Sequence, residues 1–248
     1  MNPLAHSSLS VPHGFFGRQG GVSKPPYDTL NAGLRSGDDK DAVAENRARI
    51  RDALGADFMV SLKQVHSSEV VVATNEPVGD IEADGLVTEV PGLALGILTA
   101  DCGPILLADK KAGIVGACHA GWRGALSGIV ESTVATMCEQ GASPANISAV
   151  LGPCIGPESY EVGEDFKAEF LDVSPDYQDF FASGKTESPY FDLPAFILSR
   201  LQACDVTQIA WTGQDTYKQK ADYFSYRRNT HEGLSGYGRN LSAIMLPR

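Results

Sequence analysis

The sequence predicts an α+β protein in which mixed β-sheets are flanked by helices. Two observations favour this class: short apolar runs come in groups that include a hairpin, and helical patterns lie between the groups. Strict alternation of strands and helices would predict a parallel sheet instead. The 248 residues show no internal repeat, low-complexity tract or obvious linker. One domain over residues 1–248 is therefore the simplest prediction.

Helical periodicity predicts four helices. The first can be capped by Asp38 or Asp39 and is followed by Gly55, a pattern typical of helix ends. In the second, apolar side chains recur every three or four residues until Gly141. The predicted helices span residues 38–54, 125–140, 162–171 and 193–203.

The remaining apolar runs predict strands. The run at 93–98 is apolar on both faces, so it should lie inside a sheet. Residues 13–37 are rich in Gly, Pro, Ser and Asn, which predicts turns and short strands, and the length of this segment suggests that part of it lines a site. The predicted strands span residues 69–73, 83–88, 93–98, 104–108, 113–117, 147–151, 206–211 and 241–246.

Composition narrows the choice of partners and location. The formal charge of −11 argues against nucleic-acid binding, because Lys and Arg contacts to phosphates supply most of that affinity. No apolar run reaches the roughly 18 residues of a membrane span, and the N-terminus lacks a signal-peptide pattern. The five cysteines are odd in number and lack CxxC spacing, so no disulfide framework is expected. We therefore expect a cytoplasmic protein without nucleic-acid or membrane partners.

Three residues with metal-binding side chains stand at the ends of predicted strands. Cys102 precedes the run at 104–108, and His119 follows the run at 113–117. If these runs pair as a hairpin, the two side chains become neighbours although 119 − 102 = 17 positions separate them. His66 precedes another strand and is the only other histidine in the central part of the chain. Thiolate and imidazole are both good zinc ligands.

Two imidazoles and one thiolate would leave one coordination position open, which is the mark of a catalytic zinc site. On this interpretation His66, Cys102 and His119 are both metal ligands and catalytic residues. Two alternatives stay open. Cys102 could be the nucleophile of a cysteine hydrolase, with His119 as base and the turn at 121–124 as oxyanion hole. Alternatively, Cys102 is a buried core residue and both histidines are structural.

Nine short motifs follow one another along the chain. They are HGFFGRQGGVS at 13–23, GDD at 37–39, ENR at 45–47, KQVH at 63–66, ADGLVT at 83–88, TADC at 99–102, HAGWRG at 119–124, GPCIGP at 152–157 and FSYRR at 224–228. Together they resemble the YfiH-type laccase-domain family, in order and at the expected intervals from about His13 to the C-terminus. One departure is Asp215, which stands where we expect a cysteine.

The resemblance implies an α+β domain with a catalytic Zn²⁺ whose ligands fall on His66, Cys102 and His119. It implies a purine nucleoside phosphorylase acting on adenosine, guanosine, inosine and methylthioadenosine, with adenosine deaminase activity. The family was earlier described as a copper-dependent polyphenol oxidase, and some members have been linked to editing of peptidoglycan precursors. A copper enzyme and a Cys102/His119 hydrolase therefore stay as alternatives.

Phosphorolysis requires contacts to a nucleoside and to phosphate. We expect Arg47 and Arg123 to bind phosphate, since a cationic pocket is needed, and Gln64 to contact the base or the metal-bound water. Further arginines, at positions 18, 227 and 228, are secondary candidates for the same phosphate pocket.

Overall fold

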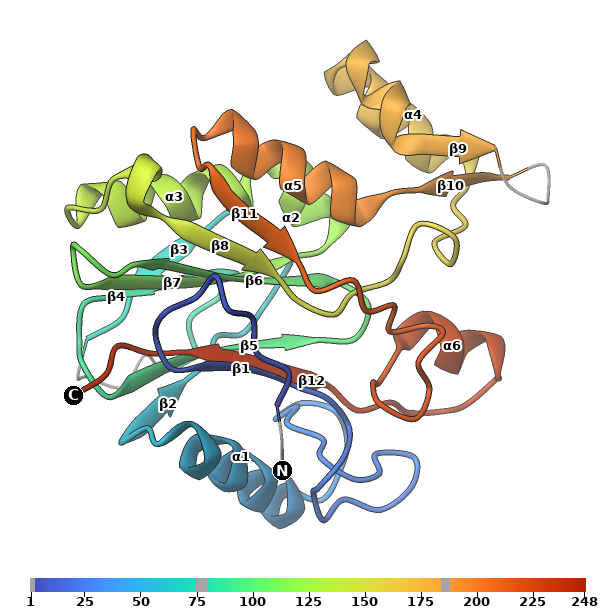
Figure 1. Cartoon of the computed structure of the whole chain (residues 1–248). Helices are drawn as coiled ribbons and strands as arrows, with labels where there is room; N and C mark the ends of the chain where they lie inside the picture. Colours follow the sequence, from blue (N-terminus) through green and yellow to red (C-terminus); the bar gives the residue numbers. More distant parts are fainter. Residues whose placement is uncertain (1–2, 75–79, 184–187) are drawn as a thin grey trace.

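Two mixed β-sheets packed face to face form the centre of the molecule (Figure 1). The computed structural model describes residues 3–74, 80–183 and 188–248. The smaller sheet has the strand order β1 (His13–Phe16), β12 (Asn240–Ile244), β5 (Leu93–Thr99), β2 (Phe58–Val60). The larger sheet has the order β11 (Gln208–Trp211), β8 (Ser148–Leu151), β6 (Gly103–Asp109), β7 (Ile114–Ala120), β4 (Gly85–Thr88), β3 (Val70–Val72). Both sheets contain parallel and antiparallel pairs, which confirms the predicted α+β class with mixed sheets.

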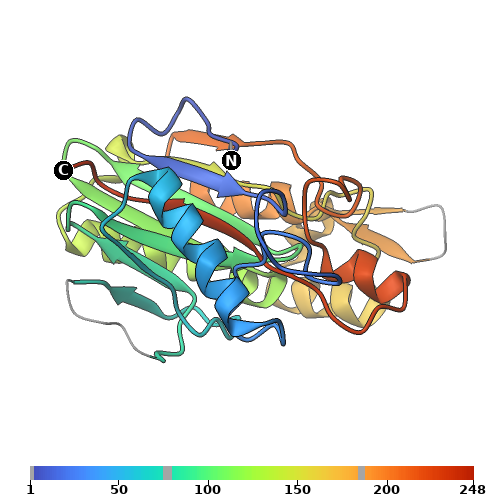
Figure 2. The same ribbon diagram turned by 90° about the horizontal axis from the view of Figure 1, so that it is seen from below.

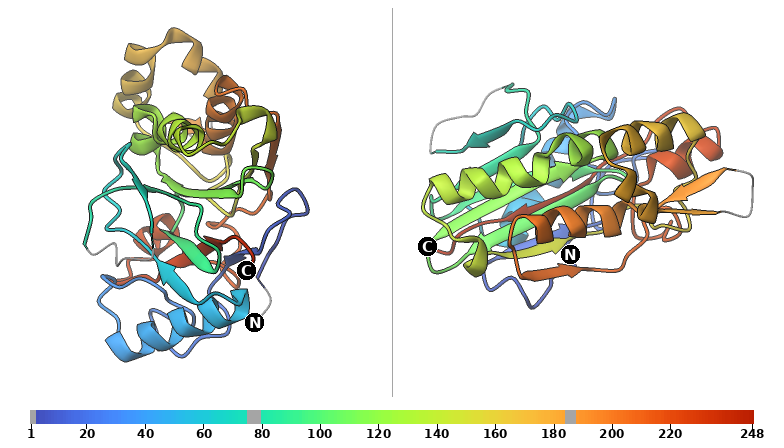
Figure 3. Two further views of the ribbon diagram at one scale, coloured as in Figure 1. Left: turned by 90° about the vertical axis from the view of Figure 1, so that its left-hand side faces the viewer. Right: turned by 90° about the horizontal axis from the view of Figure 1, so that it is seen from above.

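Helices cover the outer face of each sheet. The helices of the described residues are α1 (Lys40–Leu54), α2 (Trp122–Ser127), α3 (Ile129–Glu139), α4 (Glu164–Val173), α5 (Leu193–Ala203) and α6 (Tyr226–His231). Helix α1 crosses the four-stranded sheet (Figure 2), whereas α3 and α5 lie side by side over the six-stranded sheet (Figure 3). No helix of the described residues is both long and apolar enough to cross a membrane.

Side chains of the six-stranded sheet alternate between two hydrophobic cores, one on each face of the sheet. In β6, Ile105 and Leu107 pack in the core beneath α3 and α5, whereas Leu106 and Ala108 pack between the two sheets. Successive side chains of a strand point to opposite faces, so a strand that is apolar throughout is buried on both. Cys118 accordingly lies on the helix side, away from His119, as the alternation predicts.

Two links carry the chain from the smaller sheet to the larger one, and both leave from the same end of the layers. Residues 61–69 connect β2 to β3, and residues 100–102 connect β5 to β6. The β6–β7 hairpin then returns to this end with Gly103 opposite Ala120. The two links and the hairpin therefore bring side chains from three parts of the sequence together.

An aromatic excursion leaves the layered body after β8 (Figure 1). It contains α4, the 3-10 helix Pro175–Phe180, and the antiparallel pair β9 (Phe181–Ser183) and β10 (Pro189–Phe191). Its aromatic rings pack on the layered body. The ring centroids of Phe166 and Trp122 are 4.7 Å apart, and those of Phe170 and Phe196 are 5.1 Å apart. Aromatic rings bury large areas, so this cluster fixes the excursion to α2 and α5.

The helices differ from the sequence prediction at two places. The continuous helix predicted over residues 125–140 is wrong, because Gly128 adopts φ 101° and separates α2 from α3. A left-handed residue ends a helix, and glycine takes this conformation without a steric penalty. The first of these helices also begins earlier, at Trp122. Helix α6, in the FSYRR motif, was not predicted.

Candidate metal centre

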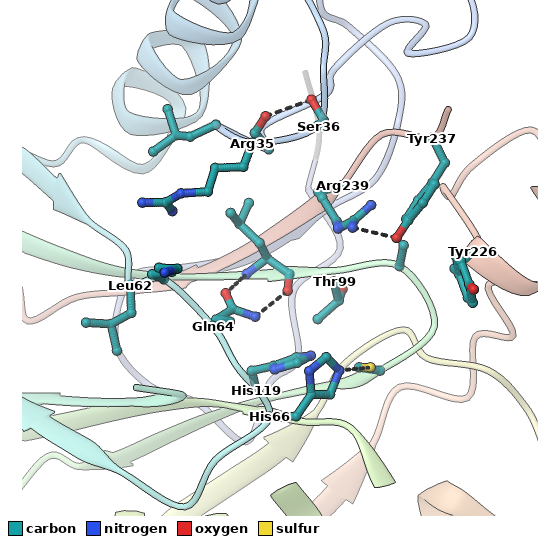
Figure 4. Close-up of a pocket in the computed structure, with 16 residues that line it drawn as sticks. Arg35, Ser36, Leu62, Gln64, His66, Thr99, His119, Tyr226, Tyr237 and Arg239 are labelled. Atoms are coloured by element: carbon teal, nitrogen blue, oxygen red, sulfur yellow. Dashed lines mark hydrogen bonds between the residues drawn. The ribbon is translucent and has the colours of Figure 1, made fainter. Parts of the chain in front are cut away.

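His66, Cys102 and His119, here called the trio, meet where the two links and the hairpin converge (Figure 4). Their ligand atoms all lie within 4.8 Å of one another. The Sγ of Cys102 lies 3.7 Å from the Nε2 of His66, and the two imidazole rings are 4.7 Å apart between centroids. The predicted hairpin is confirmed: Pro104 pairs with His119, which places the residue before β6 beside the end of β7.

Asp84 holds both histidines of the trio. Its Oδ1 accepts hydrogen bonds from the Nδ1 of His119 at 2.7 Å and from the backbone N–H of His66 at 3.0 Å. Its Oδ2 accepts from the backbone N–H groups of Val65 and Ser67 and from the Ser67 hydroxyl. Asp84 is fully buried and lies directly before β4. A carboxylate that fixes the other ring nitrogen of a histidine ligand is a recurring feature of zinc sites.

The electrostatics of the trio favour an ionised thiol. Burial is the strongest single influence on Cys102 and opposes its ionisation, but the charges and hydrogen bonds of His119 and His66 together lower the thiol pKa to about 6. Burial would likewise lower the pKa of His119, but Cys102 and Asp84 raise it to about 9. Burial would raise the pKa of Asp84, yet hydrogen bonds from His119 and Ser67 lower it to about 2. Thiolate is the form of cysteine that binds metal, so this arrangement prepares the ligand.

The backbone is strained at two positions of the site. His66 has φ 62° and Asp101 has φ 92°, a region that residues other than glycine rarely adopt. Hydrogen bonds hold both residues: Asp84 accepts from the His66 N–H, and Asp101 accepts from the Thr216 hydroxyl and the Arg227 N–H, both at 2.7 Å. Strain of this kind persists only where the surroundings determine it, and it clusters at functional sites.

The donor set fits a divalent metal. Zinc binds thiolate sulfur at roughly 2.3 Å and imidazole nitrogen at roughly 2.0 Å, so donors around one ion lie about 3.5 Å apart. The 3.7 Å between Cys102 Sγ and His66 Nε2 agrees with this spacing. Within the described ranges, the trio is the one group of three or more His, Cys, Asp or Glu side chains that could hold a metal ion. Three protein ligands leave one position for a reactant.

Two cavities meet at the trio and share His66, Ala100, Cys102 and Tyr226. The first, here called the sheet-side cavity, has a volume of about 430 Å³ and lies between the links (Figure 4). Its other lining residues include Arg35, Gln64, Thr99, His119, Tyr237 and Arg239. The second, here called the aromatic-side cavity, has a volume of about 620 Å³ and is bounded by the aromatic excursion. Its other lining residues include Trp122, Arg123, Tyr160, Phe166, Arg227 and His231.

The structure places the three predicted substrate contacts differently. Arg123 lines the aromatic-side cavity, and its guanidinium stacks 4.3 Å above the Trp122 ring. Gln64 lines the sheet-side cavity, but its amide both donates to and accepts from the main chain of Leu98 (Figure 4). Arg47 lines neither cavity; its guanidinium donates to the carbonyl of Ala32 and to the Ser61 hydroxyl. The substrate roles of all three residues stay predictions.

Sequence reasoning missed Asp84 and Tyr226. Asp84 occurs in the ADGLVT motif, where its signal is a carboxylate at the start of a strand that is buried throughout. A charged residue in that position requires partners, so it could have been found from the burial pattern. Tyr226 lines both cavities, but it belongs to the short helix α6 that periodicity did not reveal.

Comparison with known proteins adds independent information. The family described as multi-copper polyphenol oxidoreductase laccase matches residues 12–247. A protein of Deinococcus radiodurans named purine nucleoside phosphorylase is 43% identical over 247 residues, which cover 99% of this chain and 93% of that relative. The Escherichia coli K12 purine nucleoside phosphorylase YfiH is 38% identical over 217 residues, covering 87% of this chain and 88% of the relative.

A solved structure shares the fold as well. The structure of YlmD from Geobacillus stearothermophilus superposes with a TM-score of 0.88 at 30% identity, covering 98% of this chain and 94% of that one. Sequence match, relatives and structure therefore agree with the motifs and the trio described above. This chain belongs to the YfiH-type laccase-domain family.

Proposed function

We propose that this chain is a zinc-dependent purine nucleoside phosphorylase whose reaction takes place at the trio. The observation that carries the proposal is the convergence of His66, Cys102 and His119 within 4.8 Å of one another, beside two cavities. The names of the Deinococcus radiodurans and Escherichia coli relatives support the reaction type. The donor set supports zinc, because zinc accepts both imidazole and thiolate and needs no fixed geometry.

The reaction is a transfer of a pentosyl group from a purine to phosphate. The bond between the anomeric carbon and the purine nitrogen breaks, and its electron pair leaves with the base. An oxygen of hydrogen phosphate bonds the anomeric carbon, and the proton that the phosphate carried ends on the base. When bound, zinc supplies a Lewis acid beside the reacting groups.

The chain's own side chains would prepare this site in two ways. Asp84 holds the proton of His119 on Nδ1, which leaves Nε2 free to bind the metal. Arg123 offers a cation in the aromatic-side cavity for the incoming phosphate, since guanidinium groups match phosphate oxygens in geometry and charge.

The proposal also includes adenosine deamination at the same site, which the family resemblance implies. We infer inosine, guanosine, adenosine and methylthioadenosine as substrates for phosphorolysis on the same ground, with one domain and a cytoplasmic location. Deamination differs from phosphorolysis in requiring no phosphate. Incubation of adenosine with and without phosphate, followed by chromatography, therefore separates the two activities. Deamination forms inosine in both incubations, whereas phosphorolysis forms adenine and pentose phosphate only where phosphate is present.

The central experiment combines metal analysis with a phosphorolysis assay. The purified protein should contain about one equivalent of zinc and convert inosine and phosphate to hypoxanthine and ribose 1-phosphate. His119→Ala should abolish turnover and lower the bound zinc while the chain stays folded. His6→Ala is the matched control, because His6 lies in the N-terminal segment and lines neither cavity. Retained inosine turnover in His119→Ala protein would remove the metal centre from the mechanism.

A cysteine hydrolase makes a different prediction for Cys102. A hydrolase would form a thioester on Cys102, which mass spectrometry can detect after acid quenching with an amide or ester substrate. The proposed phosphorylase forms no acyl-enzyme, and its Cys102→Ser variant should lose zinc affinity. Trapping an acyl group on Cys102 would favour the hydrolase.

A further inference from the structure

The two cavities differ in whether the cationic side chains that line them form ion pairs with described carboxylates. In the aromatic-side cavity, the Arg123 guanidinium stacks on Trp122 and makes no hydrogen bond or ion pair with any described residue. Arg227 stacks 5.2 Å from the Tyr160 ring centroid and donates one hydrogen bond, at 2.6 Å, to the carbonyl of Glu161. Neither guanidinium forms an ion pair with a described carboxylate. Two cations therefore line this cavity without an anionic partner among the residues that the structure describes.

The same two cations act on the hydroxyl of Tyr160. Burial and the Cys102 thiol raise the pKa of Tyr160, whereas Arg227 and Arg123 both lower it. The geometry supports this grouping, because Tyr160 lines the same cavity as Arg123 and its ring centroid lies 5.2 Å from the Arg227 guanidinium. A phenol O–H beside two guanidinium groups is a donor set suited to an oxyanion.

The acidic residues of the aromatic-side cavity have other partners. Asp101 accepts hydrogen bonds from the Thr216 hydroxyl and from the backbone N–H of Arg227. The carboxylate of Glu161 lies 3.5 Å from the Tyr190 hydroxyl. Neither acid forms an ion pair with Arg123 or Arg227, so the guanidinium groups keep their capacity to bind an anion.

The sheet-side cavity has the opposite character. Its cations Arg35 and Lys63 form ion pairs with Asp80 and Glu82. Arg239 stacks 3.8 Å from the Tyr237 ring centroid and donates to its hydroxyl at 2.6 Å. The remaining walls contain apolar and aromatic side chains, namely Leu34, Leu62, Leu98, Tyr226 and Tyr237. Such walls suit a flat, uncharged ring system more than a small dianion.

We propose that the two cavities separate the two substrates. The aromatic-side cavity binds inorganic phosphate through Arg123, Arg227 and Tyr160, and the sheet-side cavity binds the purine nucleoside. This assignment rests on the proposed phosphorolysis. It places the reacting bond at the trio, because His66, Cys102 and Tyr226 line both cavities. Phosphate then approaches the anomeric carbon from the side opposite the base.

Steady-state kinetics with matched variants tests the assignment. Arg123→Gln and Tyr160→Phe should each raise the KM for phosphate about tenfold and leave the KM for inosine within about twofold. Tyr237→Leu should show the reverse pattern. Arg49→Gln is the control, because this exposed arginine pairs with Glu45 on α1 and lines neither cavity. An unchanged phosphate KM in Arg123→Gln, or a raised inosine KM in its place, would overturn the assignment.

A binding measurement separates this inference from the proposed function. The chain has two tryptophans, Trp122 and Trp211, so Trp211→Phe protein reports on Trp122 alone. Titration with inorganic phosphate should change the Trp122 fluorescence, because the anion binds the Arg123 guanidinium that is stacked over the ring. Arg123→Gln should weaken this binding about tenfold. If the wild-type protein does not convert inosine, the proposed function is wrong. If the enzyme is active but phosphate does not change the Trp122 fluorescence, the proposed phosphate site is wrong.

Discussion

The two histidines of the trio are held in opposite ways. His119 lies in the central strand β7, is 4% exposed, and has its ring fixed by Asp84. His66 is exposed and lies in the link between the sheets, with φ 62°. A sheet thus places one ligand, and a hydrogen-bonded loop places the other. The Oδ1 of Asp84 accepts from both residues, so one buried atom sets the position of the loop against the sheet.

The largest effect should come from Asp84→Asn, which removes the charge that joins loop and sheet. The amide keeps the shape but cannot accept all the hydrogen bonds, so we expect a loss of about 4 kcal/mol in unfolding free energy. Zinc affinity should fall about 10–100-fold. Denaturant unfolding and competition with a zinc chelator measure the two quantities.

Asp109→Asn is the control for this prediction. Asp109 is also fully buried and lies at the far end of β6, where it accepts from the N–H groups of Ala112 and Ser143. Its replacement should destabilise the fold while zinc affinity stays within about twofold. Equal zinc affinities for both asparagine variants would contradict the joining role of Asp84.

Truncating each histidine tests the difference between them directly. In metal-free protein, His119→Ala should cost about 3 kcal/mol of unfolding free energy, because it leaves the buried Asp84 without its charged partner. His66→Ala should cost at most about 0.5 kcal/mol, since an exposed ring is lost and the backbone N–H still reaches Asp84. Chemical denaturation in the presence of a chelator compares the two. Similar losses would mean that the loop is as rigidly packed as the strand.

Gly121→Ala should disturb the loop side without touching Asp84. A Cβ at Gly121 would lie 2.5 Å from the His66 ring and 3.0 Å from the sulfur of Cys102, so both ligands must shift. We expect zinc affinity to fall about tenfold, as for other changes in ligand orientation. Gly113→Ala, at the far turn of the same hairpin, is strained by its φ of 71° but has open space around it. It should lower the melting temperature and leave zinc affinity unchanged.

The same contrast explains how far the sequence alone could lead. Two short apolar runs and a turn between them predicted the β6–β7 hairpin, and pairing then brought Cys102 to His119. Periodicity carries no information about a loop whose shape depends on Asp84, so His66 joined the trio only as a candidate. Gly128 shows the limit for helices, because a single left-handed residue splits a pattern that is apolar at helical spacing on both sides.

The cations show a further limit of sequence reasoning. Arg47 and Arg123 were equal candidates in the sequence, but only Arg123 lines a cavity at the trio. Which arginine is free to bind an anion depends on the tertiary partners of each guanidinium. Ala32 and Ser61 accept from Arg47 and lie 15 and 14 residues away from it. No local pattern reveals partners of that kind.

The smallest effect concerns Cys102, whose ionisation reports on both histidines at once. In metal-free protein, its pKa of about 6 keeps roughly nine-tenths of the thiol ionised at pH 7, against about 3% for a free cysteine. Alkylation by iodoacetamide should therefore be faster than for a free thiol. The gain should be only several-fold, because a thiolate of low pKa is also less nucleophilic. The rate should fall as the pH drops through 6, where the thiolate takes up a proton.

Since His119 lowers this pKa more than His66 does, His119→Ala should slow alkylation at pH 7 more than His66→Ala. Mass spectrometry of the modified peptide measures both rates, and an equal slowing would show that the loop histidine stabilises the thiolate as strongly as the strand histidine.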